Sequence, residues 1–233
     1  MKIEQQIKGC SIKKSEAIFA QATIYGRTMN KILKVFTLLS LPVFTYSLDA
    51  PFTKTNSYIA SEEEPSSRYE RSDYLPSWAD ADGDCINTRH EVLITESRIP
   101  VTMSKNGCSV VKGEWLDRAT NQIFTDPADI DIDHTVALSE AHRSGASNWS
   151  TQRKRNFSND LSNSAVLEVM DDGANSSKGD KDPSEWLPPN EQYHCTYIKN
   201  WIEIKNLYGL TFDAKEKIAI EKILGRTNDL CSP

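Results

Sequence analysis

The sequence predicts an α+β domain stabilised by disulfides, and three observations lead to this fold class. Segments 129–138 and 165–169 carry short apolar patterns typical of strands. Segment 192–208 carries a longer pattern with the period of a helix. Four cysteines follow residue 50, and an even number in an exported chain favours disulfide bonds.

Composition divides the chain into four parts. Residues 29–50 combine a short basic region with an apolar run, which is the pattern of a secretory signal peptide and too short for a membrane span. Residues 1–28 precede this signal and are interpreted as an extension that arises from a start codon placed too early. Residues 51–75 are rich in Ser, Thr and Glu, which indicates a disordered linker or a pro-region. Residues 76–233 are expected to form one secreted domain with no stable membrane association.

Several elements follow from local patterns in the first half of this domain. Segment 88–98 is compatible with a helix or a strand, because its apolar run is short. Lys112-Gly113 lies between two short apolar stretches and predicts a hairpin or bulge. Segment 129–138 alternates Ile130 and Ile132 with polar residues, which predicts a strand pair. Segment 139–144 begins with a serine that can cap a short helix.

The second half reads as mostly helical. Segment 151–161 is expected to form a basic helix with Phe157 and Leu161 on one side. A strand over 165–169 leads into a turn and the Asn175 segment. The clearest helix covers 192–208, and Asp213 with Glu216 resembles a capping box for a last helix through Leu224, ended by Gly225.

The four cysteines after the signal, Cys85, Cys108, Cys195 and Cys231, allow three disulfide pairings. We favour the sequential one, Cys85–Cys108 and Cys195–Cys231, because each bridge then closes a moderate loop. A zinc site built from these cysteines is the alternative, but the sequence contains no C-x-x-C pair.

The net charge of this domain disfavours the binding of a polyanion. From residue 51 onward, 20 Lys and Arg stand against 30 Asp and Glu, a net charge of −10. Such a surface repels nucleic acid at long range, so contact would need a local basic patch and metal ions. The candidate patch consists of Arg143, Arg153, Lys154 and Arg155. A solvated helix face is the alternative interpretation of these residues.

The stretch Asp131-Ile132-Asp133-His134, followed by Asn163 and Asn175, carries the chemistry of phosphodiester hydrolysis. A neutral histidine can take the proton of an attacking water, and His134 is the candidate general base. Mg²⁺ or Mn²⁺ prefers oxygen ligands, which Asp133 and Asn175 can provide. Asp131 is expected to be structural, and Lys178 is a candidate phosphate contact.

Asp133 and His134 are adjacent, so their side chains should point to opposite faces of a regular strand. A bend or bulge at this point would let both approach one phosphate. The base must also be held in one orientation, and Asn163 could do this by hydrogen bonding across the strand pair.

These residues resemble the HNH, or ββα-metal, nuclease motif. The longer run that includes Asn159-Asp160-Leu161-Ser162-Asn163, 178–183 and Glu185-Trp186-Leu187-Pro188 is similar to the C-terminal nuclease domains of GmrSD-like restriction enzymes, over roughly 85–231. The resemblance implies a ββα-metal core with additional helices, His134 and Asn163 as catalytic residues, and a metal held by Asp133 and Asn175. It also implies products with a 5′-phosphate and a 3′-hydroxyl.

The sequence therefore predicts a secreted, metal-dependent endonuclease that cuts DNA, with RNA as a second candidate substrate, and with little sequence preference. The alternatives are a non-catalytic secreted binding domain on a nuclease-like scaffold and a D-x-D site for nucleotide sugars at Asp131 and Asp133. Asn148, Asn156 and Asn175 each begin a glycosylation sequon. A glycan on Asn175 would be incompatible with metal binding there. Oligomeric state is not predicted.

Overall fold

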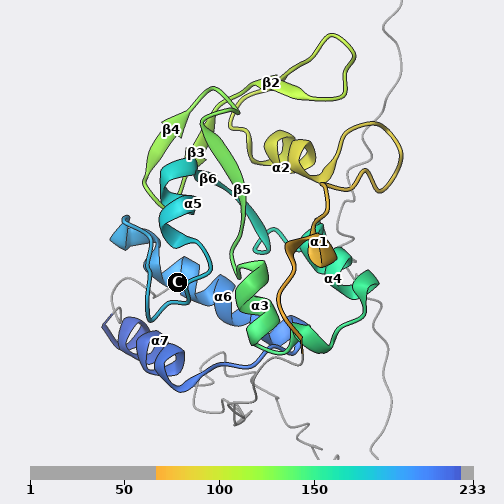
Figure 1. Cartoon of the computed structure of the whole chain (residues 1–233). Helices are drawn as coiled ribbons and strands as arrows, with labels where there is room; N and C mark the ends of the chain where they lie inside the picture. The colour runs from red at the N-terminus through yellow and green to blue at the C-terminus, as the bar shows by residue number, and fades with distance from the viewer. Residues whose placement is uncertain (1–66, 227–233) are drawn as a thin grey trace, which may run out of the picture. The chain divides into compact units, whose positions relative to one another are not determined.

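The computed structural model describes residues 67–226 (Figure 1). The predicted signal peptide over 29–50, the segment 1–28 and most of the predicted linker lie outside the described residues. Helices surround three two-stranded sheets, so the chain has the predicted α+β class. Within the described residues, no helix combines the length and apolar character needed to cross a membrane.

The central unit consists of two strands and the helix that follows them. β5 (Ile130–His134) pairs antiparallel with β6 (Leu167–Asp171), and Asp133 lies opposite Glu168. α5 (Asp172–Lys178) begins directly after β6, where the Asp171 carboxylate accepts a hydrogen bond from the Ala174 amide at 2.8 Å. Of the strand pair predicted over 129–138, one strand is present and ends at His134, while Leu138 begins α3. The strand predicted over 165–169 is present and shifted two residues along the chain.

Two smaller sheets lie beside this unit. β1 (Thr102–Met103) pairs with β2 (Val110–Lys112), and β3 (Trp115–Asp117) pairs with β4 (Gln122–Phe124). Of the hairpin or bulge predicted around Lys112-Gly113, the hairpin is wrong, because the two flanking strands pair with other partners. The register of β1 against β2 does shift between Val110 and Lys112. Gly113 instead allows close packing, since a Cβ there would lie 2.5 Å from the Trp115 ring.

The N-terminal part of the described structure already belongs to the core. α1 (Arg71–Tyr74) precedes α2 (Thr88–Glu96), which resolves the predicted choice between helix and strand over 88–98 in favour of a helix. Tyr74 is fully buried, and Ser158 Oγ donates to its carbonyl. The packed domain therefore begins before Pro76, where the sequence placed its start.

Three helices connect β5 to β6: α3 (Leu138–Arg143), the 3₁₀ helix η1 (Ala146–Asn148) and α4 (Thr151–Ser158). Ala137, and not the predicted Ser139, occupies the N-cap of α3, without a side-chain hydrogen bond. α4 ends at Ser158, so Leu161 lies beyond it and is 50% exposed while Phe157 is buried. The predicted pairing of these two on one helix face is wrong because the helix is shorter.

The C-terminal helices α6 (His194–Tyr208) and α7 (Ala214–Arg226) lie below the strands in Figure 1, in the same region as α3. The 3₁₀ helix η2 (Glu191–Tyr193) leads into α6, and α7 follows. The predicted capping box is present: the Glu216 amide donates to Asp213 Oδ1 at 2.8 Å, and the Asp213 amide donates to Glu216 Oε2 at 3.2 Å. α7 continues through Gly225 to Arg226, one residue past the predicted stop.

One predicted disulfide lies within the described residues. Cys85 and Cys108 are joined by an S–S bond of 2.07 Å and link the loop before α2 to the β1–β2 connection. Cys195 is buried in α6, but Cys231 lies outside the described residues, so the second pairing stays a prediction.

Candidate active site

The pairing of β5 is regular from Ile130 through His134, so the predicted bend or bulge is not there. Side chains therefore alternate between the two faces of the strand. Asp131 and Asp133 face α5, where both have hydrogen-bond partners. His134 lies on the other face, against the ring of Trp78.

Three polar contacts join α5 to β5. Asn175 Nδ2 donates to Asp131 Oδ2 at 2.9 Å, and Lys178 Nζ donates to Asp133 Oδ1 at 2.9 Å. The same ammonium donates to the His134 carbonyl at 2.8 Å. Asn175 and Lys178 are three residues apart and share one helix face. The structure thus pairs Asn175 with Asp131, and Lys178 with Asp133.

Asp133 is 5% exposed, and one of its two carboxylate oxygens has no hydrogen-bond partner among residues 67–226. Oδ1 accepts from Lys178, while Oδ2 is buried without a hydrogen bond from any described residue. Burial raises the pKa of Asp133, and the Lys178 ammonium opposes that effect. Burying a carboxylate oxygen without a hydrogen-bond donor destabilises the folded state unless another group, such as a water or a cation, binds to that oxygen.

Two further buried polar groups lie close to this carboxylate. Glu168 lies opposite Asp133 in the sheet and accepts from Tyr193 Oη at 2.5 Å; burial raises the pKa of Glu168 to about 7. The Tyr197 hydroxyl is buried without a hydrogen bond among the described residues, and burial together with Asp133 raises its pKa. Among the described residues, the acidic groups beneath β5 are thus accompanied by the Lys178 ammonium at Asp133 and the Arg118 guanidinium 3.8 Å from Glu168.

His134 is held by a backbone carbonyl and an aromatic ring. Nε2 lies 2.9 Å from the Ser158 carbonyl, which only accepts, so Nε2 carries the proton. The rings of His134 and Trp78 stack with centroids 5.7 Å apart and planes 5° apart. Burial lowers the pKa of His134 to about 3. The imidazole is neutral at physiological pH, and Nδ1 is the nitrogen able to accept a proton.

Asn163 does not hold His134 in the structure. Its Nδ2 donates to Glu203 Oε1 at 2.8 Å, and its Oδ1 accepts from the Ala165 amide at 2.9 Å. The carbonyl of Ser158 fixes the histidine tautomer instead. Sequence patterns could not identify Ser158 or Trp78, because a backbone carbonyl and a ring stack leave no signature in residue type.

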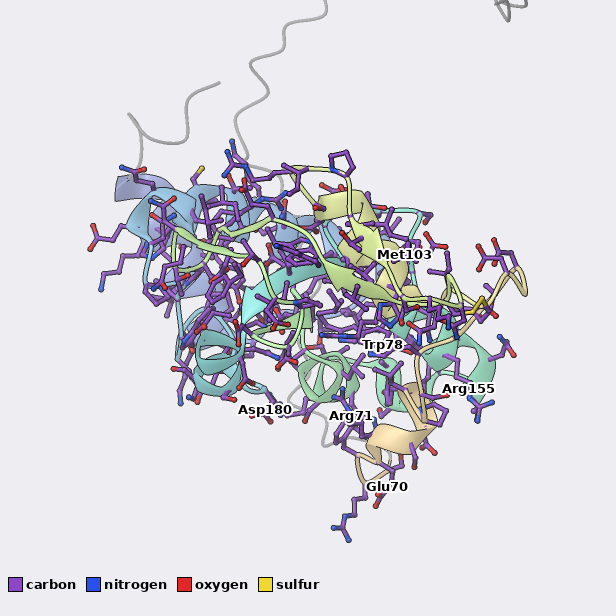
Figure 2. The ribbon with its side chains drawn as sticks, turned by 90° about the horizontal axis from the view of Figure 1, so that it is seen from above. Glu70, Arg71, Trp78, Met103, Arg155 and Asp180 are labelled. Atoms are coloured by element: carbon purple, nitrogen blue, oxygen red, sulfur yellow. A yellow bond between two sulfur atoms is a disulfide. The ribbon has the colours of Figure 1, made fainter. Side chains whose placement is uncertain are left out.

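The predicted basic patch divides into different environments. Arg143 contacts Asp180 and Glu140, and Arg153 lies over the Trp149 ring at 4.3 Å. Lys154 is 6% exposed beside Asp73. Arg155 is exposed, and Figure 2 shows it at the periphery of the molecule. Lys178, the predicted phosphate contact, is fully buried.

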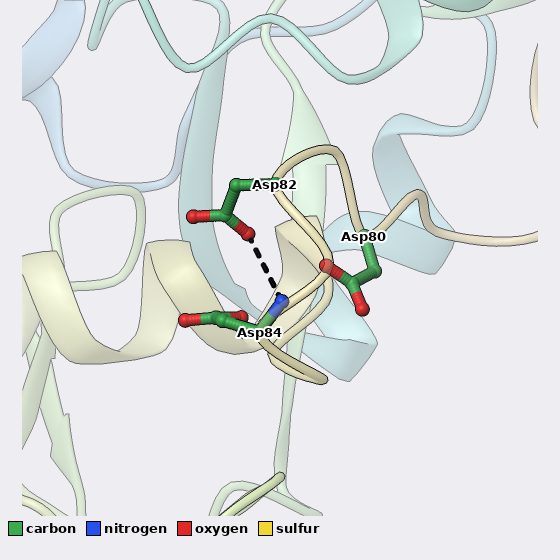
Figure 3. Close-up of side chains that lie close together, drawn as sticks. All are labelled: Asp80, Asp82 and Asp84. Atoms are coloured by element: carbon green, nitrogen blue, oxygen red, sulfur yellow. Dashed lines mark hydrogen bonds between the residues drawn. The ribbon is translucent and has the colours of Figure 1, made fainter.

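An acidic loop before α2 was not singled out by the sequence. Asp80, Asp82 and Asp84 are exposed, with one carboxylate oxygen of each within 4.8 Å of the others (Figure 3). Asp80 accepts from the amides of Gly83 and Cys85 at 2.8 and 3.0 Å. Hydrogen bonds to the loop's own backbone account for this arrangement, and we assign no ion to it.

Known proteins match most of the described domain. A protein of Arthroderma benhamiae described as an uncharacterized secreted protein is 38% identical over 161 residues, which cover 69% of this chain and 76% of that protein. No solved structure matches. Residues 88–223 match the family of GmrSD restriction endonucleases, C-terminal domain. The chain therefore belongs to the family of GmrSD restriction endonuclease C-terminal domains, as the residues around His134 predicted.

Proposed function

We propose that the protein is a secreted, metal-dependent endonuclease that hydrolyses phosphodiester bonds of DNA, with RNA as a second substrate class. One observation carries this proposal: Asp133 and His134 end the first strand of an antiparallel pair, and Asn175 lies on the helix that follows the second strand. This is the order expected of a ββα-metal core. The family name, which refers to restriction endonucleases, agrees with it.

The oxygen atoms around α5 suit a hard divalent cation. Asp133 Oδ2 is a buried carboxylate oxygen without a hydrogen-bond donor, which a cation would satisfy. Asn175 directs its side-chain Nδ2 toward Asp131, and in our proposal its side-chain Oδ1 is the oxygen that binds the cation. In our proposal Asp133 and Asn175 hold Mg²⁺ or Mn²⁺, which neutralises the phosphate and stabilises the leaving oxygen when bound.

In our proposal His134 removes a proton from water, which requires the end of β5 to rearrange when substrate binds, because Asp133 and His134 lie on opposite faces of the regular strand. Its neutral form prevails above pH 3 because its pKa is lowered to about 3. The Ser158 carbonyl holds the proton on Nε2, so Nδ1 is the basic nitrogen. Because a weak base transfers protons less effectively, we propose that an approaching phosphate and water raise the basicity of Nδ1. The role of Asn163 is then confined to the loop before β6, where it contacts Glu203.

Substrate contacts should go to phosphates. Arg155 and Arg153 are exposed on α4, whereas Lys154 and Lys178 are buried, so we assign the first contacts to the two arginines and to Arg143. With a net charge of −10 from residue 51 onward, binding should be weak and should decrease quickly with salt.

Export is supported by three features. The relative from Arthroderma benhamiae is described as secreted, Cys85 and Cys108 form a disulfide, and residues 29–50 have the pattern of a signal peptide. Disulfides persist in oxidising compartments, which agrees with secretion.

A plasmid-nicking assay with Mg²⁺, with and without a chelator, tests this function. Wild type should nick plasmid with Mg²⁺ and not with chelator. His134→Ala should lower the rate by about 10²–10⁴-fold, and His134→Asn serves as a variant that can still donate to the Ser158 carbonyl. His194→Ala is the matched control, since His194 also contacts a backbone carbonyl, that of Pro188. Folded wild type without any cleavage would favour the non-catalytic binding domain.

A further inference from the structure

We propose that Lys178 is a positioning residue, which fixes the Asp133 carboxylate and the end of β5 so that one carboxylate oxygen is presented to the metal. This inference rests on the proposed function, since it assigns Lys178 a role toward the same site. The sequence suggested a phosphate contact for this lysine. A fully buried ammonium cannot meet a substrate phosphate in this conformation.

The contacts of Lys178 reach both residues on which the chemistry depends. Its Nζ lies 2.9 Å from Asp133 Oδ1 and 2.8 Å from the carbonyl oxygen of His134. The exposed fraction is 0% for the lysine side chain and 5% for the aspartate side chain. A buried ammonium is tolerated only when paired and hydrogen bonded, so this geometry is strongly specified.

The ion pair distinguishes the two oxygens of Asp133. Oδ1 is occupied by Lys178, and Oδ2 is left without a partner among the described residues. A carboxylate free to rotate would offer either oxygen to a cation or turn both toward neighbouring donors. With Oδ1 fixed, the carboxylate can offer one oxygen in one direction, which suits the sparse ligation that Mg²⁺ prefers.

Lys178 also sets the position of the second proposed ligand. Asn175 and Lys178 lie one turn apart on α5, and each contacts a different residue of β5. Loss of the Lys178 contact should therefore loosen α5 against β5 and move Asn175 as well. Substitution of residues that orient metal ligands in this way typically lowers metal affinity or activity by about 10–100-fold.

A purely structural role is the alternative, and the chain offers a matched control for it. Lys205 is also 0% exposed, and its Nζ contacts Glu140 and Glu216 at 2.7 Å each, joining α3, α6 and α7. Both lysines are buried cations held by carboxylates, but only Lys178 contacts the proposed site. Lys178→Met and Lys205→Met should therefore both lower stability, while only the first should affect the metal.

The experiment compares Mg²⁺-dependent nicking and Mn²⁺ binding, measured by electron paramagnetic resonance, in wild type, Lys178→Met and Lys205→Met. Lys178→Met should lose about 10–100-fold in Mn²⁺ affinity and in turnover, with little change in the KM for plasmid. Lys205→Met should retain both below its unfolding temperature. Folded Lys178→Met with wild-type Mn²⁺ affinity and turnover would overturn the inference.

A measurement on the unaltered protein covers the case in which Lys178→Met does not fold. The ¹⁵Nζ resonances of the two buried lysines are assigned with Lys205→Met, and Mn²⁺ is then added to wild type. The Lys178 resonance should broaden strongly and that of Lys205 should not. Mn²⁺ binding without preferential broadening of Lys178 would contradict the proposal. Wild type that neither binds Mn²⁺ nor cleaves plasmid would instead refute the proposed function.

Discussion

Burial of neutral His134 should make the stability of the domain depend on pH in a way that one substitution can isolate. Its pKa is lowered from 6.5 to about 3, first because of burial. The unfolded chain therefore takes up a proton below about pH 6.5 that the folded domain does not accept until about pH 3. The stabilisation is fully present above pH 6.5 and is lost as the pH falls from there toward pH 3.

The size of this effect follows from the two pKa values. Between about pH 8 and about pH 5, protonation of His134 in the unfolded chain should lower the free energy of unfolding by about 2 kcal/mol. At pH 5 this figure depends mainly on the unfolded pKa, so the depth of the folded shift hardly changes it. Glu168, whose pKa is raised to about 7, acts in the opposite direction, because its stabilisation is lost as the pH rises through 7.

The assay is urea unfolding of wild type and His134→Gln at both pH values. The substitution removes the titrating group and leaves Glu168 in place, so the difference between the two proteins reports His134 alone. Wild type should lose about 2 kcal/mol more than the variant on going from pH 8 to pH 5. Equal losses in both proteins would show that His134 is protonated similarly in the folded and unfolded states.

Two further predictions concern parts of the fold away from His134. Lys205→Met leaves Glu140 and Glu216 buried without their shared cation. The substitution should lower the free energy of unfolding, measured by urea unfolding, by about 3–5 kcal/mol. A loss below about 1 kcal/mol would show that the three charges are not strongly coupled. Cys85→Ser together with Cys108→Ser opens a loop with a sequence separation of 23 and should cost about 3 kcal/mol, measured against unreduced wild type. An unchanged unfolding midpoint would mean that the loop is already constrained in the unfolded chain.

Local sequence patterns succeeded where one element determines its own structure. The capping box of Asp213 and Glu216 needs only two residues three positions apart, and the structure contains it. The alternation around Ile130 and Ile132 predicted β5 because the strand buries its apolar residues. The Cys85–Cys108 disulfide followed from cysteine order in the chain.

The same patterns failed where a distant contact decides the outcome. The Lys112-Gly113 turn was misread because the strand after Gly113 packs Trp115 into the core and pairs with a later strand. The partner of Asp133 is 45 residues away in α5, and no spacing rule connects the two. Asn163 was expected beside His134, yet a contact with Glu203 in α6 holds it elsewhere. The assignments of base, metal ligands and substrate contacts stay predictions.

Trp78 lies outside the segment 88–223 that matches the family. The ring that covers one face of His134 thus comes from the stretch that precedes residue 88. The same stretch supplies Tyr74 to the core and Cys85 to the disulfide. A recombinant fragment trimmed to residues 88–223 would expose that imidazole to water and leave Cys108 without its disulfide partner. The surroundings of the His134 imidazole therefore depend on a segment that the family match does not include.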